Sequence, residues 1–214
     1  MIAGKREEHT AGPCRREGFA VVVEPTRVVD GRNVPMTDVV DVHRPVAGDV
    51  IDLILADHAL FELLLRQLRD ASSDRGAVLD ALSNVLVAHA EAEEKFVYPK
   101  LRKRSAVGAH EAEHGEEEHA EGHEALLKVL ELKGTDTKAF DDAVEELSAT
   151  INHHLVEEEL TILNPARSEL GSRARADLGT EFVRERNRQI DGNCGTLTKV
   201  RALVARSRRE GKLD

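Results

Sequence analysis

The stretch LVAHAEAEEKFVYP, residues 86–99, decides the fold, because it places ionisable side chains inside a run of hydrophobic residues with helical spacing. His89 comes four positions before Glu93, and residues four apart on an α-helix project side by side from one face. A second stretch, HHLVEEELTILNP at 153–165, has the same spacing between His154 and Glu158. The chain therefore carries two helices on which a histidine and a glutamate share one face.

The similarity extends to the helices before these two, since DHALFELLLRQL at 57–68 resembles GHEALLKVLEL at 122–132. Corresponding residues are separated by a constant 65 positions: His58 to His123, His89 to His154, and Glu93 to Glu158. The sequence is therefore predicted to contain two helical hairpins that contribute the same polar residues.

Hydrophobic periodicity predicts four helices in this region. Apolar residues recur at steps of three and four around His58, and they are Ile54, Phe61, Leu64, Leu65 and Leu68. The first helix ends at DASSDRG (70–76), and the others span about 77–104, 109–132 and 138–164. Four helices with short links predict an all-α fold, an antiparallel up-down four-helix bundle.

Composition restricts the class of protein. The chain has 214 residues, 33% of them charged, and a formal net charge of −10, which argues against nucleic acid as a partner. No apolar run is long enough to span a membrane, and the start MIAGKREEHTAG lacks the apolar stretch expected of a signal peptide. The two cysteines, Cys14 and Cys194, match neither a disulfide framework nor a metal motif, so we expect a cytoplasmic protein.

The ionisable residues on the predicted inner faces point to a bound cation. Burying an unpaired carboxylate or imidazolium costs several kcal/mol, so four helices that each direct such groups inward need a compensating charge. A solvated polar stripe is the alternative, but His58 lies within the apolar stripe of its helix, whereas a solvated stripe would lie opposite. The repeat therefore predicts a metal site.

The tract HEAEHGEEEHAEGHEALL, residues 110–127, is weighed separately because most of it must be solvated. His119 lies four residues before His123 and would add a fifth histidine, although Ile54 occupies its place in the first repeat. The HEAEH segment at 110–114 matches the His-Glu-x-x-His pattern of zinc proteases, but its helix lacks an apolar face. We therefore expect His119 to be a ligand and the protease match to be accidental.

These residues resemble the hemerythrin-like, or HHE cation-binding, domain proteins, and the resemblance covers about Val50 to Pro165. It implies a non-heme di-iron centre of two iron ions. Carried over residue by residue, the resemblance implies these metal ligands: His58, His89, Glu93, His119, His123, His154 and Glu158.

The fourth helix departs from the oxygen-carrying hemerythrins, which separate histidine and aspartate by five residues. His154 and Glu158 follow the four-residue spacing of the HHE proteins, while Glu159 and His153 remain alternatives as ligands. Pro99 and Pro165 resemble the family's helix endings and are expected to stop or kink the helix just past the metal layer.

The predicted domain organisation has three parts. Residues 1–45 form a flexible N-terminal extension, with a short hairpin from FAVVVEPTRVVDGRNV and a start at Met36 as open alternatives. Residues 46–168 form the hemerythrin-like bundle, and 169–214 form extra C-terminal helices. Residues 166–214 hold twelve Lys or Arg against seven Asp or Glu, so we expect this segment to pack on the acidic bundle or to bind a protein partner.

The resemblance implies binding of dioxygen, peroxide or nitric oxide, because five histidines over two metals leave one coordination position open. Two bridging carboxylates with five neutral imidazoles suit a small neutral or anionic ligand. Slow peroxide consumption is one activity such a centre supports. The alternatives are an iron-responsive regulatory module and a metal-storage bundle without redox turnover.

Overall fold

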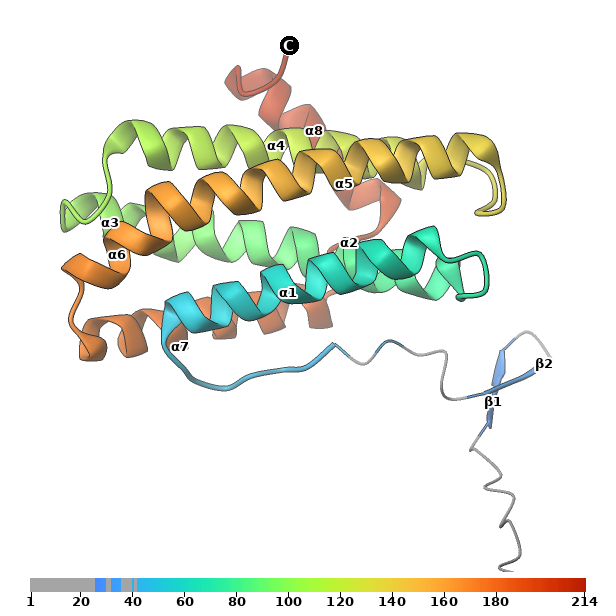
Figure 1. Ribbon diagram of the computed structural model, residues 1–214, viewed down its shortest axis with the longest axis horizontal. Helices are drawn as coiled ribbons and strands as arrows, with labels where there is room; N and C mark the ends of the chain where they lie inside the picture. The colour runs from blue at the N-terminus through green and yellow to red at the C-terminus, as the bar shows by residue number, and fades with distance from the viewer. Residues whose placement is uncertain (1–25, 30–31, 36–39, 41) are drawn as a thin grey trace, which may run out of the picture. The chain divides into compact units, whose positions relative to one another are not determined.

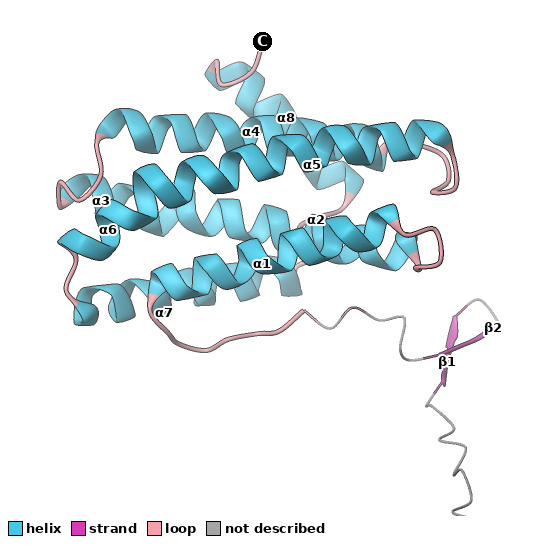
Figure 2. Cartoon of the chain, in the orientation of Figure 1, coloured by secondary structure: helices cyan, strands magenta, loops and turns pink. Residues whose placement is uncertain are grey.

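The structure is a computed structural model that describes residues 26–29, 32–35, 40 and 42–214. It divides into two compact units, Met1–Thr37 and Asp38–Asp214. In the first unit, strand β1 (Thr26–Val29) pairs antiparallel with β2 (Arg32–Pro35), so a short hairpin is present (Figure 2). The expectations about a flexible extension, Cys14 and a start at Met36 fall on residues outside this description.

The second unit is helical throughout its regular structure, which confirms the predicted all-α class for this part of the chain. The long helices are α1 (Val50–Arg69), α2 (Arg75–Ala92), α4 (Ala109–Leu130), α5 (Lys138–Glu158), α7 (Ser172–Asp191) and α8 (Leu197–Glu210). Short helical segments continue α2 and α5: the π-helices η2 (Glu93–Val97) and η3 (Glu159–Leu163), followed by α3 (Tyr98–Lys103) and α6 (Asn164–Glu169).

The sequence predicts that two prolines stop or kink the helix just past the metal layer. They do not stop it, because Pro99 and Pro165 each lie in the first turn of a new helical segment, α3 or α6. Proline is tolerated at a helix start, where its missing N–H has no intrahelical partner to lose. A π turn precedes each of these segments, and the chain stays helical to Lys103, close to the predicted end at 104, and to Glu169, past the predicted end at 164.

Local sequence sets where the helices begin. Asp49, Asp74 and Thr137 are the N-caps of α1, α2 and α5, and each side chain accepts a hydrogen bond from a backbone N–H in the first turn. Such caps satisfy donors that have no partner inside the helix. The four helices α1, α2, α4 and α5 then lie alongside one another, with α1 contacting α2 and α5, and α4 contacting α5 (Figure 1).

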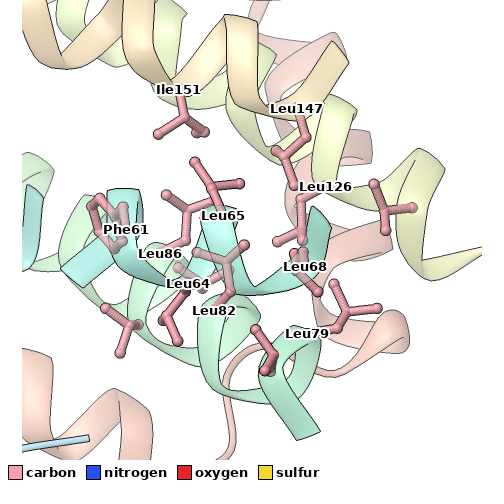
Figure 3. Packing of buried hydrophobic residues seen from close by; sticks show 14 of the residues in the cluster. Phe61, Leu64, Leu65, Leu68, Leu79, Leu82, Leu86, Leu126, Leu147 and Ile151 are labelled. Atoms are coloured by element: carbon pink, nitrogen blue, oxygen red, sulfur yellow. The ribbon is translucent and has the colours of Figure 1, made fainter. Parts of the chain in front are cut away.

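Leucine and phenylalanine side chains fill the interior on one side of the ionisable residues. Leu64, Leu68, Leu82 and Leu126 are fully buried, and they belong to one apolar cluster with Leu147 of α5 (Figure 3). A second apolar cluster around Tyr98 and Ile162 lies on the other side. The ionisable residues thus sit between two apolar layers, which fixes their depth in the unit.

The C-terminal helices pack on the same unit. Helix α7 contacts α1, α2 and η2, and α8 contacts α4 (Figure 1). Basic residues of this segment pair with acidic ones of the earlier helices: Arg201 with Glu131, Arg206 with Glu91, Arg208 with Glu124 and Lys212 with Glu116. No helix in the described part of the chain is long and apolar enough to cross a membrane.

The backbone of α7 approaches the segment before α1 closely. A Cβ atom added at Gly179 would collide with the carbonyl oxygen of Gly48, so the contact requires glycine at this position. About one turn and two turns further along α7, the side chains of Phe182 and Arg186 reach the interior, where both are at most 2% exposed. The close backbone contact therefore brings α7 near the ionisable residues.

Candidate metal centre

All seven residues of the predicted ligand set are buried, each with an exposed fraction of 5% or less. They come from α1, α2, η2, α4 and α5: His58, His89, Glu93, His119, His123, His154 and Glu158. Burial of so many ionisable side chains is costly unless each one has a partner of opposite charge. The distances between their nitrogen and oxygen atoms indicate which bound partner these side chains fit.

Six of the seven form three overlapping groups whose nitrogen or oxygen atoms lie within 4.8 Å of one another. The groups are His58, His89 and Glu158; His89, Glu93 and His119; and Glu93, His154 and Glu158. Nitrogen and carboxylate oxygen ligands at this density fit a transition-metal cation. Because the groups share both glutamates, the arrangement also suits more than one ion.

The ligand atoms mainly face one another: Nε2 of His58 lies 3.1 Å from Oε2 of Glu158, and Nε2 of His89 and His119 lie 3.1 Å and 3.3 Å from Oε2 of Glu93. Apart from such contacts within the set, no described residue satisfies the following buried atoms: Nε2 of His58, His89, His119, His123 and His154, both carboxylate oxygens of Glu93, and Oε2 of Glu158. Native interiors rarely leave buried polar atoms unsatisfied, so such a concentration requires an explanation. A cation held among them satisfies them together, and the residues therefore fit a metal.

The other ring nitrogen, Nδ1, of four histidines faces a second carboxylate. These contacts are His58 to Glu159 (2.9 Å), His89 to Asp57 (3.2 Å), His119 to Glu94 (3.2 Å) and His154 to Glu118 (3.0 Å). Metal-bound histidines commonly donate their other N–H to a carboxylate, which fixes the tautomer and the ring orientation. We call these four acidic residues the outer carboxylates, and they leave Nε2 free to bind a metal.

Two of the histidines lie between carboxylates on both sides. Burial lowers the pKa of His89, but Glu93 and Asp57 outweigh burial and raise this pKa to about 10. Burial likewise lowers the pKa of His119, and hydrogen bonds to Glu93 and Glu94 raise it to about 9. In the metal-free protein these rings are therefore cationic at neutral pH and neutralise the buried carboxylates.

His123 is in a different environment. Burial, reinforced by the nearby His119, lowers its pKa to about 4. It belongs to none of the three groups but lines a cavity of about 10 Å³ with His119, His154 and Phe61. A neutral imidazole at the edge of this cavity is ready to act as a ligand.

The helices change from α to π geometry at or next to the two glutamates. Glu93 is the first residue of η2, and Glu158 immediately precedes η3. Single π turns inside α-helices occur frequently at functional sites. The extra turn also positions Tyr98, which is fully buried, stacks on the His119 ring and donates a hydrogen bond to Oε1 of Glu158 (2.9 Å).

The structure separates the predicted alternatives. His110 and His114, of the protease-like pattern, are exposed and take part in none of the three groups. His153 has a side chain that is 64% exposed, whereas its neighbour His154 is buried. Glu159 faces Nδ1 of His58 from a partly exposed position, outside the groups.

Sequence reasoning missed the remaining parts of the site: Asp57, Glu94, Glu118, Tyr98 and Arg186. The sequence did contain a signal for Asp57, Glu94 and Glu118. Each of these outer carboxylates directly adjoins a proposed ligand in the sequence. Glu94 and Glu159 are also 65 residues apart, so they obey the repeat. Arg186 lies far along the sequence, on α7, and the local sequence pattern does not predict its contact with Asp57.

Comparison with known proteins gives two matches and one negative result. The model of the Hemerythrin HHE cation binding domain matches residues 49–165. A DNA nickase from Nostoc sp. (strain PCC 7120 / SAG 25.82 / UTEX 2576) is 27% identical over 137 residues, 63% of this chain but only 38% of the nickase. No solved structure matches. The family match covers more than half of the chain and includes all seven buried residues, so the chain belongs to the hemerythrin HHE cation-binding domain family.

Proposed function

We propose that this chain is a non-heme di-iron protein that binds an oxygen-derived small ligand: dioxygen, peroxide or nitric oxide. The observation that carries the proposal is the set of buried Nε2 and carboxylate oxygen atoms that face one another in three overlapping groups, with no further hydrogen-bond partner among the described residues. Five imidazoles and two carboxylates would hold the ions, with Glu93 and Glu158 shared between them. In this proposal, α1, α2, α4 and α5 form the family's four-helix bundle, residues 46–168, and α7 and α8 are additions to it.

The protein's own residues contribute charge, orientation and shielding. Ferrous ions in such a site supply electrons and an open coordination position for the small ligand. The two glutamates would offset part of the positive charge, and the outer carboxylates would accept the Nδ1–H of their histidines, so that Nε2 is the nitrogen directed at the ion. Phe61, Leu86 and Ile151 line the small cavity beside His123, so they exclude bulk water from it. A cavity of about 10 Å³ admits only the smallest molecules, which favours a diatomic ligand over a larger substrate.

An anaerobic iron-loading experiment tests the proposal. We expect about two irons per chain, by ligand count, and an absorption spectrum that changes on adding air, peroxide or nitric oxide. Zinc-loaded protein is the matched control, since zinc has no redox chemistry and should show no such change. A reproducible content of one metal or fewer, with all five histidines intact, would contradict the dinuclear proposal.

An iron-responsive regulatory module is the second candidate, and the contacts of α7 favour it. Arg186 of α7 pairs with Asp57, which in turn faces His89, so the C-terminal segment contacts the metal site indirectly. If iron sensing is the function, chelation should expose the segment after Pro165 to proteases and reduce the circular dichroism signal. If ligand binding is the function, the fold should barely change, because the apolar layers are complete without metal.

DNA nicking, the activity named for the Nostoc relative, is weaker as a proposal for this chain. The chain spans well under half of that protein. Its ionisable cluster is buried, so a phosphodiester backbone has no access to it. The net charge of −10 also repels the phosphates of DNA. Incubating metal-loaded protein with supercoiled plasmid should leave the plasmid intact, and relaxation by the wild type but not by a Glu93→Ala variant would reverse this ranking.

A further inference from the structure

Helix α7 supplies a buried cation to the surroundings of His89. Nε of Arg186 donates to Oδ2 of Asp57 (2.7 Å), and a terminal nitrogen of the same guanidinium donates to Oδ1 (2.6 Å). Arg186 is 2% exposed and Asp57 4% exposed. This two-point geometry is specific to arginine and fixes the plane of the carboxylate.

The same carboxylate holds the histidine. Oδ2 of Asp57 lies 3.2 Å from Nδ1 of His89, whose Nε2 belongs to two of the three metal-binding groups. One turn before Arg186, Phe182 places its ring edge-on to the His89 ring, with centroids 5.9 Å apart. Two successive turns of α7 therefore reach one side chain of the metal centre.

Among the described residues, the second half of the repeat has no counterpart of the arginine that holds Asp57. His154, the counterpart of His89, faces Glu118 through Nδ1, and Gly122 occupies the position that corresponds to Asp57. The side chains near Glu118 are histidines rather than an arginine. The two halves thus provide similar ligands, while α7 contacts the outer carboxylate of the first half, Asp57.

We propose that α7 is a working part of the metal centre, in which Arg186 acts through Asp57 as a positioning residue for His89. This inference rests on the proposed metal site and extends it beyond residues 49–165, the part that the family describes. The fork of Arg186 holds the Asp57 carboxylate, and that carboxylate holds the imidazole with Nε2 directed at the ion. A family domain cut off before α7 would lack this support.

A purely structural role for the pair makes a different prediction. An ion pair that only anchored α7 would affect stability when broken, but not the properties of a bound metal. A residue that acts through Asp57 has no further effect once Asp57 has lost its function, so the two substitutions should be non-additive in metal affinity. This difference gives the test.

The experiment measures Co²⁺ affinity and the visible Co²⁺ spectrum of the full chain. The variants are Arg186→Gln, Asp57→Asn and the double variant, with Arg188→Gln as the matched control, because Arg188 is a neighbouring arginine whose side chain is 61% exposed. We expect each of the two single substitutions to weaken Co²⁺ binding about 10-fold or more and to alter the spectrum. The double variant should match Asp57→Asn within about twofold, and the control should match the wild type within the same factor.

Several outcomes would overturn the inference. Unchanged affinity and spectrum in Arg186→Gln would do so, and so would a double variant that loses the product of the two single effects. If Arg186→Gln alone does not fold, comparing Asp57→Asn with the double variant still decides, because a further loss in the double variant contradicts the inference and equality supports it. A wild type that binds no Co²⁺ would instead refute the metal centre on which the inference rests.

Discussion

Adding a divalent cation to the metal-free protein is predicted to release protons from the centre. His89 and His119 each lie between two carboxylates, and a histidine donates hydrogen bonds from both nitrogens only when it is protonated. Their pKa values of about 10 and about 9 keep both rings charged at neutral pH. A metal binds only the neutral imidazole, so each ring must lose a proton.

The size of the effect follows from these pKa values. Each pH unit below a pKa corresponds to 1.36 kcal/mol, so at about pH 7.5 deprotonation costs about 3 kcal/mol at His89 and about 2 kcal/mol at His119. With about two protons released, the apparent affinity should rise about 100-fold per pH unit until His119 titrates. The pKa of His58 is also raised, with Glu158 outweighing burial, which acts in the same direction.

The stability of the metal-free protein should change in the opposite direction. Both pKa values are raised above the ordinary 6.5, so the stabilisation from the charged rings is complete below about pH 6.5. It is lost as the pH rises through about 9 for His119 and about 10 for His89. The increase in melting temperature on adding a cation should therefore grow with pH across this range.

Calorimetric titration with Zn²⁺ in two buffers of different ionisation enthalpy counts the released protons directly. His89→Gln should lower the count by about one. His153→Gln is the control and should leave the count unchanged, because His153 adjoins the buried His154 in the sequence but has an exposed side chain. Release of fewer than about one proton per chain, or an affinity that does not depend on pH, would refute the paired-carboxylate reasoning.

Three further predictions concern single side chains. Replacing Glu93 with alanine should empty or halve the iron content measured by mass spectrometry, while His110→Ala should leave it at about two per chain; the reverse result would favour the protease-like pattern. Tyr98→Phe removes a donor to a buried carboxylate and should lower the free energy of unfolding of the metal-free protein by about 1.5–3 kcal/mol in urea titrations, so a change below about 0.5 kcal/mol would show that the hydrogen bond contributes little. Gly179→Ala forces a collision and should lower stability by about 1–3 kcal/mol, whereas Gly171→Ala, with open space around it, should not; equal melting temperatures would contradict the close contact.

The sequence predicted the helices and their inner faces well, because both depend on local periodicity. The helix predicted at 109–132 is α4, Ala109–Leu130, and the helix predicted from 138 begins at Lys138. The 65-residue offset singled out His154 over His153, and the structure buries only His154. Whether all seven buried residues bind metal stays a prediction until a metal is measured.

What the sequence did not predict depends on contacts between distant segments. The outer carboxylate of His89 comes from a different helix, and its arginine partner lies 129 residues further along the chain. Helical periodicity places a residue on a face but says nothing about which opposing side chain it meets. The π turns were also missed, because Glu93–Val97 and Glu159–Leu163 lie within segments that the sequence predicted as continuous helices.

The mixing of the two halves within each group of ligands also determines when, during synthesis, the protein becomes able to capture a cation. The emerging first hairpin offers only His58, His89 and Glu93, which do not form any of the three groups by themselves. One group is complete only after His119 has been made, and the other two await Glu158. Domains generally fold as units as the chain leaves the ribosome, so the nascent first half has no finished site with which to take up metal. An ion held by either of the groups that contain Glu158 can therefore bind only after both repeats have been synthesised and have packed together.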